Sequence, residues 1–248
     1  MGDSTGLEKS PSSQCLKPMN SENAKTAEQS SSLAELLSSP VYKENLNFWE
    51  RAWAPLKTPY TQMPDLAYLN EIPAYLKARH AKRILDLGCG SGWLSIFLAR
   101  EKFAVTGVDV ATQALNLAKL WAEQEQLEIT FDVYDIAKMP YSEGSFDAIV
   151  ANSIFEHFTL ELATETMERL KTLLVPGGAF VGCFDKVGGG PGEYYELSDG
   201  THIYTDKGRA GMLLRNFSSD ELRSFFSDWT VDGFDQLESG SRFVRAHL

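Results

Sequence analysis

Cysteine is scarce in this sequence, and the three cysteines that occur form no structural pattern. Cys15, Cys89 and Cys183 are odd in number and widely spaced, so they predict neither a disulfide framework nor a pair of metal ligands. Histidine and acidic residues also form no cluster with metal-ligand spacing, and we expect no metal cofactor. This usage is typical of a reducing compartment, and we expect a cytoplasmic protein.

Long apolar runs and clustered cations are missing too. No stretch approaches the roughly 18 apolar residues that a membrane-spanning helix needs, and no apolar targeting segment opens the chain. Lys and Arg total 23 against 34 Asp and Glu, which gives a net charge of -11. Because phosphate contacts require clustered Lys and Arg, we expect neither a nucleic acid nor a membrane as partner.

Aromatic residues are absent from residues 1–39, which contain ten serines. Such a segment buries too little apolar area to offset the entropy of ordering, so residues 1–40 are predicted to form a flexible Ser-rich tail. Leu33, Leu36 and Leu37 are spaced for one short helical turn. A regulatory or docking role is the alternative interpretation of the tail.

Aromatic residues gather immediately after the tail. The stretch YKENLNFWERAWAPL places Trp49 and Trp53 at helical spacing. A second helical stretch covers about residues 65–79 and is interrupted at Pro73. We expect both helices to form an N-terminal helical cap, residues 41–80, whose aromatic side chains either pack in the core or cover a ligand.

Strand and helix patterns alternate from Arg83 onward. The runs typical of strands are RILDL, AVTGVDV, LEITFDVY, SFDAIVAN and AFVGCFD. In the third run, Ile129, Phe131 and Val133 alternate toward the interior. Such alternation predicts a doubly wound, Rossmann-like α/β fold, a mostly parallel sheet with helices on both faces. Two final runs, TVDGFDQLE and SRFVRAHL, flank Ser239-Gly240 and predict an antiparallel hairpin.

Helical patterns separate these strands and lie over about residues 92–102, 112–124, 159–174 and 218–227. Thr112 and Ser218 are the expected N-caps of two of these helices. The Pro-Gly-Gly sequence at 176–178 is expected to stop the third helix and start the next strand. Residues 186–217 show no clear periodicity, and a loop of that length in a compact domain is usually functional or mobile.

Three glycines follow the first strand, in the turn DLGCGSG. In doubly wound sheets the ligand lies outside the carboxyl ends of the strands, where this turn is placed. Gly88, Gly90 and Gly92 lack Cβ atoms, which permits tight turns and close approach of a ligand to the backbone. The dinucleotide pattern G-x-G-x-x-G needs glycine where Trp93 stands, which argues against pyrophosphate binding and a nicotinamide enzyme.

Acidic residues accompany this turn and the next two strand ends. Asp86 precedes the first glycine by two residues, and its carboxylate suits a cationic amine better than a phosphate. Asp109 ends the second strand, where it can accept hydrogen bonds from both hydroxyls of a ribose. Asp135 closes the third strand, where it can accept from the exocyclic amine of adenine while Ile136 packs against the ring. The expected ligand carries adenine, ribose and a cationic amine, without phosphate.

In combination and in this order, these motifs resemble those of the class I S-adenosylmethionine-dependent methyltransferases. The matching stretches are ILDLGCGSG, GVDV, YDI and LLVPGG, and the resemblance covers roughly residues 84–181. It implies a seven-stranded sheet with an antiparallel last strand, S-adenosylmethionine as cofactor, and a glycine turn that holds the methionine portion. The cofactor-binding residues it implies are Asp86, Gly88, Cys89, Gly90, Gly92, Asp109, Val110, Asp135, Ile136, Asn152 and Ser153.

The fourth strand ends in ANSIFEHF, a segment that the resembling family places beside the methionine portion and the transferred methyl. Methyl transfer from a sulfonium is an in-line displacement, in which the protein mainly aligns the acceptor and excludes water. His157 is the candidate catalytic base because the ordinary pKa of histidine is about 6.5, with a capping or filling role at the helix start as the alternative. Glu156 is expected to be solvated.

The acceptor is expected to meet residues 186–217. The candidate acceptor-binding residues are Trp49, Tyr194, Tyr195, His202, Tyr204, Arg209 and Arg215. The arginines and the histidine favour a small-molecule, anionic acceptor, with surface ion pairing of the arginines as the alternative. The fourth strand is followed by neither a [DNS]-P-P-[YFW] tetrapeptide nor a Pro-Cys pair, which argues against methylation of adenine or glutamine amino groups and of cytosine C5.

Two further functions stay open at this point. One is a protein or peptide methyltransferase that uses the tail or the aromatic cap to recognise its partner, and the other is a non-catalytic S-adenosylmethionine-binding sensor. The accepting atom and the oligomeric state do not follow from the sequence. The expected organisation is a tail (1–40) and one domain (41–248), divided into cap (41–80), cofactor-binding core (81–185), acceptor-site insertion (186–217) and C-terminal helix and hairpin (218–248).

Overall fold

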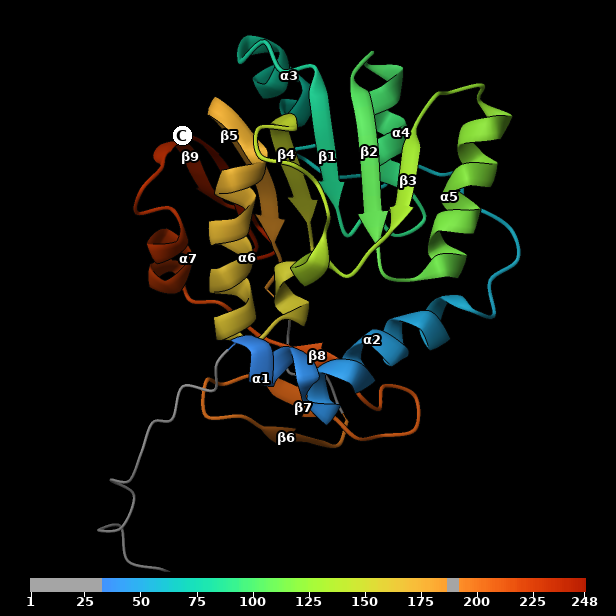
Figure 1. Ribbon diagram of the computed structural model, residues 1–248, viewed down its shortest axis with the longest axis vertical. Helices are drawn as coiled ribbons and strands as arrows, with labels where there is room; N and C mark the ends of the chain where they lie inside the picture. The colour runs from blue at the N-terminus through green and yellow to red at the C-terminus, as the bar shows by residue number, and fades with distance from the viewer. Residues whose placement is uncertain (1–32, 187–191) are drawn as a thin grey trace, which may run out of the picture. The chain divides into compact units, whose positions relative to one another are not determined.

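The structure, a computed structural model, describes residues 33–186 and 192–248. A seven-stranded sheet forms its centre, with the strands β1 (Arg83–Leu87), β2 (Ala104–Asp109), β3 (Thr130–Val133), β4 (Phe146–Asn152), β5 (Leu174–Phe184), β9 (Thr230–Gln236) and β10 (Arg242–His247). Their order is β3-β2-β1-β4-β5-β10-β9 (Figure 1). β10 runs antiparallel to β5 and β9, and the other neighbours are parallel. The predicted sheet with its C-terminal hairpin is confirmed.

Helices cover both faces of this sheet, as predicted. They are α3 (Glu71–Ala78), α4 (Trp93–Arg100), α5 (Thr112–Gln124), α6 (Leu160–Leu173) and α7 (Ser219–Phe225). Ile84 of β1 belongs to the core beneath α3 and α4, whereas Leu85 belongs to the core beneath α6 and α7. Successive side chains of a strand point to opposite faces, so one apolar strand supplies both cores.

Two further helices, α1 (Leu33–Ser38) and α2 (Pro40–Trp53), lie at the carboxyl ends of the parallel strands (Figure 1). The Ser39 hydroxyl caps α2 by accepting a hydrogen bond from the Tyr42 backbone N–H at 3.1 Å. Pro40 fits the first turn because its missing N–H has no helical partner there. α1 occupies the end of the expected tail, whose residues 1–32 lie outside the described residues.

The second helix of the expected cap is shorter than predicted. α3 begins at Glu71, and residues 67–70 form turns. Pro73 does not interrupt α3, because it lies in the first turn, where backbone N–H groups lack helical partners. Tyr68, in the preceding turn, packs in the same core as Ile72, which explains why the apolar spacing extended the predicted helix.

A small antiparallel sheet, which the sequence analysis did not predict, occupies part of the expected insertion. Its strands are β6 (Tyr194–Glu196), β7 (His202–Tyr204) and β8 (Leu213–Leu214). Strands of two or three residues are too short to show an alternating pattern. The sheet is joined to α2, since Arg51 donates to the Ala210 carbonyl at 2.7 Å and the Asn45 side chain accepts from the Leu213 N–H at 3.1 Å.

Three local predictions were wrong. Thr112 is the first residue of α5 instead of its cap, and both its hydroxyl and its N–H donate to the Glu50 carboxylate of α2, at 3.0 and 3.1 Å. Val133 is 45% exposed, because β3 is an edge strand with a neighbour on one side only. β5 begins at Leu174, so the Pro-Gly-Gly sequence lies inside the strand, beside an irregularity in its pairing with β4.

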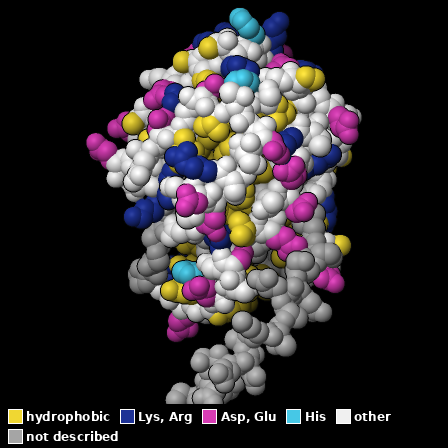
Figure 2. All heavy atoms as spheres, turned by 90° about the vertical axis from the view of Figure 1, so that its left-hand side faces the viewer, with side chains coloured by type: hydrophobic (Ala, Val, Ile, Leu, Met, Phe, Trp, Pro, Cys, Tyr) yellow, Lys and Arg dark blue, Asp and Glu magenta, His cyan; other side chains and the backbone are white. Residues whose placement is uncertain are grey.

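The predicted cap of the last helix agrees with the structure. Ser218 caps α7, and Glu221 completes a capping box with it. Cys89 and Cys183 are buried free thiols. No helix within the described ranges is long and apolar enough to cross a membrane. On the face shown in Figure 2, Lys and Arg side chains are interspersed with Asp and Glu.

Candidate functional site

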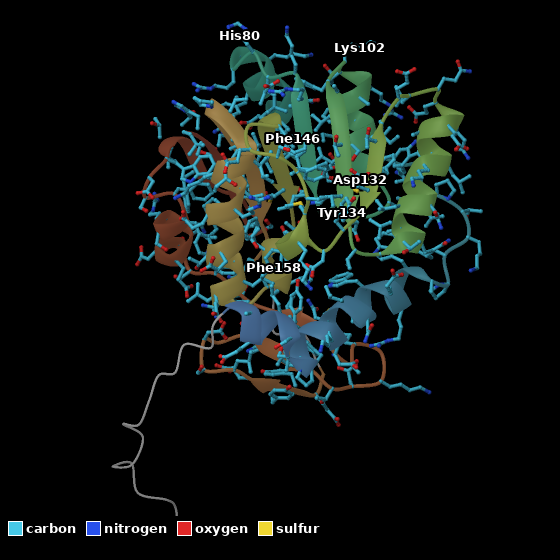
Figure 3. All side chains as sticks on the ribbon, in the orientation of Figure 1. His80, Lys102, Asp132, Tyr134, Phe146 and Phe158 are labelled. Atoms are coloured by element: carbon cyan, nitrogen blue, oxygen red, sulfur yellow. The ribbon has the colours of Figure 1, made fainter. Side chains whose placement is uncertain are left out.

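A cavity of about 270 Å³ lies at the carboxyl ends of the parallel strands, beneath α2. It is lined by Tyr42, Asn45, Leu46, Trp49 and Trp53 of α2; Gly88, Cys89, Gly90, Ser91 and Trp93 after β1; Asp109, Val110, Asp135, Ile136 and Ala137 at the ends of β2 and β3; and Asn152, Ser153, Ile154, His157, Phe158 and Leu162 after β4. Phe158 marks this end of the sheet in Figure 3, whereas His80 and Lys102 mark the opposite end.

The predicted residues separate clearly around this cavity. Every predicted cofactor-binding residue except Asp86 and Gly92 lines it, and so do Trp49 and His157. Asp86 lies beneath the glycine turn instead, and Gly92, the last glycine of the turn, packs against α5. The lining residues of α2 follow one helical face, and that spacing is the signal in the sequence that groups Tyr42, Asn45 and Trp53 with Trp49.

The glycine turn requires backbone conformations that other residues rarely adopt. Gly88, Gly90 and Gly92 have φ angles of 66°, 52° and 86°. A Cβ on Gly90 would point toward α2, 3.2 Å from the Trp53 ring, whereas one on Gly92 would lie 2.8 Å from the Cβ of Ala118 in α5. Gly90 therefore keeps the cavity open, while Gly92 permits close packing of α4 on α5.

Asp109 is held rigidly at the end of β2. Its Oδ2 accepts a hydrogen bond from the Gly90 N–H at 2.9 Å, and its Oδ1 accepts from the Ala111 N–H at 2.8 Å. Burial raises the pKa of Asp109 above its ordinary value, and the hydrogen bonds oppose that rise. Each oxygen retains a further lone pair, so this carboxylate can accept from a diol in the cavity.

Asp135 caps the short helix η1 (Ile136–Lys138) and meets α2. Its Oδ1 accepts from the Tyr42 hydroxyl at 2.5 Å and from the Ala137 N–H at 3.0 Å. Its Oδ2 is buried without a hydrogen-bond partner among the described residues, and the Lys138 ammonium lies 3.5 Å away. A buried acceptor of this kind is costly to leave unpaired, so it suits a ligand N–H donor.

Asp86 was predicted to face the ligand, but it does not line the cavity. It is 1% exposed, and the Ser95 hydroxyl of α4 donates to its carboxylate at 2.6 Å. Burial raises the pKa of Asp86 to about 7. Asp86 therefore makes no direct contact with a ligand amine. It lies beneath the turn and connects β1 to the start of α4 through Ser95.

His157 closes the short helix η2 (Phe155–His157) beside α2. Its Nδ1 lies 3.1 Å from the Leu213 carbonyl oxygen, and its ring contacts Trp49 edge-on with centroids 4.5 Å apart. Burial lowers the pKa of His157, which favours the neutral ring at neutral pH. Because a carbonyl accepts, the neutral ring protonated at Nδ1 leaves Nε2 as an acceptor.

Asn152 and Ser153 line the cavity and are hydrogen-bonded to each other, and Asn152 also to the Tyr68 hydroxyl. The Asn152 amide donates to the Ser153 hydroxyl at 3.0 Å, and the Tyr68 hydroxyl donates to the Asn152 Oδ1 at 2.6 Å.

Glu156 was expected to be solvated, and this prediction was wrong. It is 1% exposed, it accepts from the Asp185 N–H, and burial raises its pKa to about 8.

The predicted acceptor residues of the insertion do not line the cavity. Arg215 is 4% exposed, forms an ion pair with Glu221 and lies over the Phe217 ring. Arg209 pairs with Asp206 at 2.9 Å. Both guanidinium groups are therefore engaged in ion pairs within the protein, and neither lines this cavity.

The remaining residues of that prediction also lie elsewhere. Tyr194 stacks on His202 at 4.1 Å, and Tyr204 contributes to the buried side of the small sheet. Tyr195 is 48% exposed. Among the residues that the structure describes, no group of three or more His, Cys, Asp and Glu side chains could hold a metal ion.

Comparisons with known proteins agree with this geometry. Residues 84–178 match the family model described as a methyltransferase domain. A ubiquinone biosynthesis O-methyltransferase of Coxiella burnetii is 36% identical over 103 residues, which are 42% of this chain and 42% of the relative. A 2-heptyl-1-hydroxyquinolin-4(1H)-one methyltransferase of Mycobacteroides abscessus is 30% identical over 152 residues, 60% of this chain and 59% of the relative. The matched part of the chain thus spans about two fifths and three fifths of these relatives' lengths.

Solved structures share the fold. The PH0226 protein from Pyrococcus horikoshii aligns with a TM-score of 0.61 at 19% identity, covering 79% of this chain and 98% of that chain. The fold and the motifs together define a Rossmann-like methyltransferase domain. Residues 84–178 match that methyltransferase domain, in agreement with the resemblance to the class I S-adenosylmethionine-dependent methyltransferases.

Proposed function

We propose that the chain transfers a methyl group from S-adenosylmethionine to a small-molecule acceptor and releases S-adenosylhomocysteine. One arrangement carries the proposal. The ends of β1, β2 and β3 present a glycine turn, the Asp109 carboxylate and the Asp135 carboxylate to a single cavity. The names of the relatives, an O-methyltransferase and a hydroxyquinolinone methyltransferase, support a small-molecule acceptor.

The residues of the cavity fit the parts of this cofactor. Asp109 is assigned to the ribose hydroxyls, and the Oδ2 of Asp135, which has no hydrogen-bond partner among the described residues, to the exocyclic amine of adenine. Ile136 supplies an apolar contact for the base, and the backbone from Gly88 to Gly90 accommodates the methionine portion. Each hydrogen bond to a carboxylate contributes about 1.5–3 kcal/mol.

The chain's own contribution to the reaction is mainly alignment. When bound, S-adenosylmethionine supplies an activated methyl group and a neutral leaving group. Helix α2 covers the cavity and limits the access of water, while Leu46 and Trp49 offer an apolar wall to the acceptor. His157 takes the acceptor's proton where the acceptor still carries one at neutral pH.

The charges of the residues that line the cavity narrow the chemical class of acceptor that we propose. Among the described residues that line the cavity there is no Lys or Arg, and its carboxylates belong to the proposed cofactor side. We therefore infer an acceptor without a carboxylate or phosphate near the accepting atom. A cytoplasmic location and independence from metal and nucleic acid stay predictions.

Isotope transfer distinguishes the proposed function from its alternatives. The full-length protein is incubated with tritiated S-adenosylmethionine and either a panel of hydroxylated aromatic metabolites or intact cell protein. The proposal expects label in small molecules, while label in protein favours a peptide methyltransferase. Tight binding of S-adenosylhomocysteine by calorimetry without transfer to any fraction favours a sensor, and the absence of binding by folded protein contradicts the methyltransferase assignment itself.

A further inference from the structure

Asn45 connects three segments that are far apart in the sequence. It lies in α2, is 3% exposed, and its Oδ1 accepts a hydrogen bond from the Leu213 N–H of β8 at 3.1 Å. Its Nδ2 donates to the backbone carbonyl of His157 at 3.3 Å. The same Leu213 residue places its carbonyl oxygen 3.1 Å from the His157 Nδ1. Leu213 and His157 are thus linked twice, once directly and once through Asn45.

We propose that Asn45 is a positioning residue that, through Leu213, fixes the tautomer and orientation of His157, so that Nε2 receives the proton of a neutral acceptor hydroxyl. The inference rests on the proposed function. Asn45 holds Leu213 by its backbone N–H, and the carbonyl of the same residue, in the next peptide group, accepts the His157 Nδ1–H. Trp49 packs edge-on against the ring and restricts its rotation.

The surroundings of His157 define the class of acceptor. Leu46 and Trp49 are the apolar neighbours on α2, and the ring is neutral, so this part of the cavity favours an uncharged compound with an apolar body that carries a hydroxyl. In the reaction the hydroxyl proton moves to Nε2 and the oxygen takes the methyl. The sulfonium becomes a neutral thioether, and the positive charge ends on the imidazolium, which releases its proton to solvent.

The small sheet gains a function from this arrangement. β8 serves as a support for His157, whereas the exposed side chains of β6 lie away from the cavity. Burial lowers the pKa of His157, while the hydrogen bond to the Leu213 carbonyl and the charge of Asp185 raise it, and the neighbouring Glu156 is the other acidic group at this end of the sheet. Burial has the largest effect and favours the neutral ring. Asn45 therefore acts on which ring nitrogen carries the proton, and not on whether the ring is charged.

The decisive measurement is nitrogen NMR of the full-length protein labelled with ¹⁵N-histidine, above the pKa of His157. The His157 signal is assigned with the His157→Gln variant. We expect the neutral wild-type ring to carry its proton on Nδ1. Asn45→Ala is expected to populate the Nε2–H form and to lower kcat by about tenfold, because a base that is misplaced or in the wrong tautomer loses part of its contribution.

A matched control lies in the same helix. Asn47 is exposed, and Asn47→Ala is expected to leave the tautomer and kcat as in the wild type. Asn45→Asp retains the acceptor for the Leu213 N–H but loses the donor to the His157 carbonyl and adds a charge, so it should retain the Nδ1–H form and raise the pKa of His157. This variant keeps the test open where Asn45→Ala does not fold.

Two results would overturn the inference: an Nε2–H ring in the wild type, or an unchanged tautomer and unchanged kcat in folded Asn45→Ala. Calorimetry with S-adenosylhomocysteine on the same wild-type sample reports on the proposed function separately. A missing binding signal there contradicts the proposed function, whereas normal binding with an unaltered tautomer in Asn45→Ala contradicts the role of Asn45 alone.

Discussion

The two sides of the cavity are built in different ways. On the side of Asp109 and Asp135, each functional group directly follows a strand, and the parallel sheet brings consecutive strand ends together. On the side of His157, the contacts join α2, η2 and β8, which are separated by 112 and 56 residues along the chain. The first side follows from strand topology, whereas the second depends on how a cap helix and a small sheet pack over the strand ends.

This difference has consequences for specificity. The groups assigned to the cofactor are anchored by backbone hydrogen bonds within the sheet's own loops, as the contacts of Asp109 with Gly90 and Ala111 illustrate. The groups assigned to the acceptor are anchored by side chains such as Asn45. Substitutions around Asn45 and in the small sheet can therefore change the acceptor side without altering the cofactor side, whereas Tyr42 of α2 contacts the cofactor side through Asp135.

The largest expected effect separates the two sides through His157. His157→Gln should lower kcat at least about a hundredfold, because a general base contributes about 10²–10⁴-fold. The affinity for S-adenosylhomocysteine, measured by calorimetry, should stay within about twofold. A parallel loss of affinity would show that His157 belongs to the cofactor side.

Asp109→Ala is the converse change. It removes the carboxylate assigned to two ribose hydroxyls, and the affinity for S-adenosylhomocysteine should fall by about a hundredfold or more, since each such bond contributes about 1.5–3 kcal/mol. Asp132→Asn serves as control, because Asp132 lies on β3 and accepts from Tyr141 outside the cavity. Equal affinities for the two variants would contradict the assignment of Asp109.

The pH dependence of stability reports on two buried carboxyl groups, Asp86 behind the cofactor side and Glu156 behind the acceptor side. Burial raises the pKa of Asp86 from 3.8 to about 7 and that of Glu156 from 4.5 to about 8. The folded state binds the extra proton, so stability should fall as pH rises through these windows, by at most about 1.4 kcal/mol per pH unit for each group. Asp86→Asn should remove the dependence between about pH 4 and 7, and Glu156→Gln that between about pH 4.5 and 8.

Denaturant unfolding at a series of pH values checks this prediction. The exposed residue Glu165 provides the control variant Glu165→Gln, which should follow the wild-type curve. A wild-type stability that rises steadily across pH 4.5 to 8 in step with both variants would exclude these carboxyls as the source.

Two glycines of one turn should respond differently to the same change. Both variants place alanine at a positive φ, which costs about 1–2 kcal/mol. Gly92→Ala should lower the free energy of unfolding further, because its Cβ would lie 2.8 Å from the Cβ of Ala118. Gly90→Ala should chiefly lower the affinity for S-adenosylhomocysteine, because its Cβ would enter the cavity near Trp53. Thermal unfolding and calorimetry on both variants test whether packing and binding separate in this way.

The smallest expected effect lies where the two sides meet. Tyr42 of α2 donates to the Oδ1 of Asp135, and Tyr42→Phe removes that bond without removing the ring. The affinity for S-adenosylhomocysteine should fall by about three- to tenfold, since a hydrogen bond to a charged group is replaced. Tyr60→Phe is the control, because Tyr60 is 70% exposed outside this cavity. An unchanged affinity of Tyr42→Phe would show that Asp135 needs no support from α2.

The sequence predicted some parts of the site and missed others. It located Asp109 and Asp135 because each stands at the end of an apolar run, and it located the glycine turn for the same reason. It placed Glu156 in solvent because a single charged residue beside an aromatic gives no signal of burial. It assigned Arg215 to an acceptor because pairing with Glu221 depends on the capping box of α7, and such pairing is not visible from composition.

The sequence by itself determined the strand-helix alternation, the doubly wound sheet and the residues at the strand ends, because periodicity and strand-end motifs are local properties of the chain. Only the tertiary structure decided which side of the turn Asp86 faces, which arginines are already paired, and how Asn45 reaches both His157 and Leu213. These features depend on the docking of α2 and of the small sheet, and docking is fixed by shape and by long-range hydrogen bonds that no short stretch of sequence encodes.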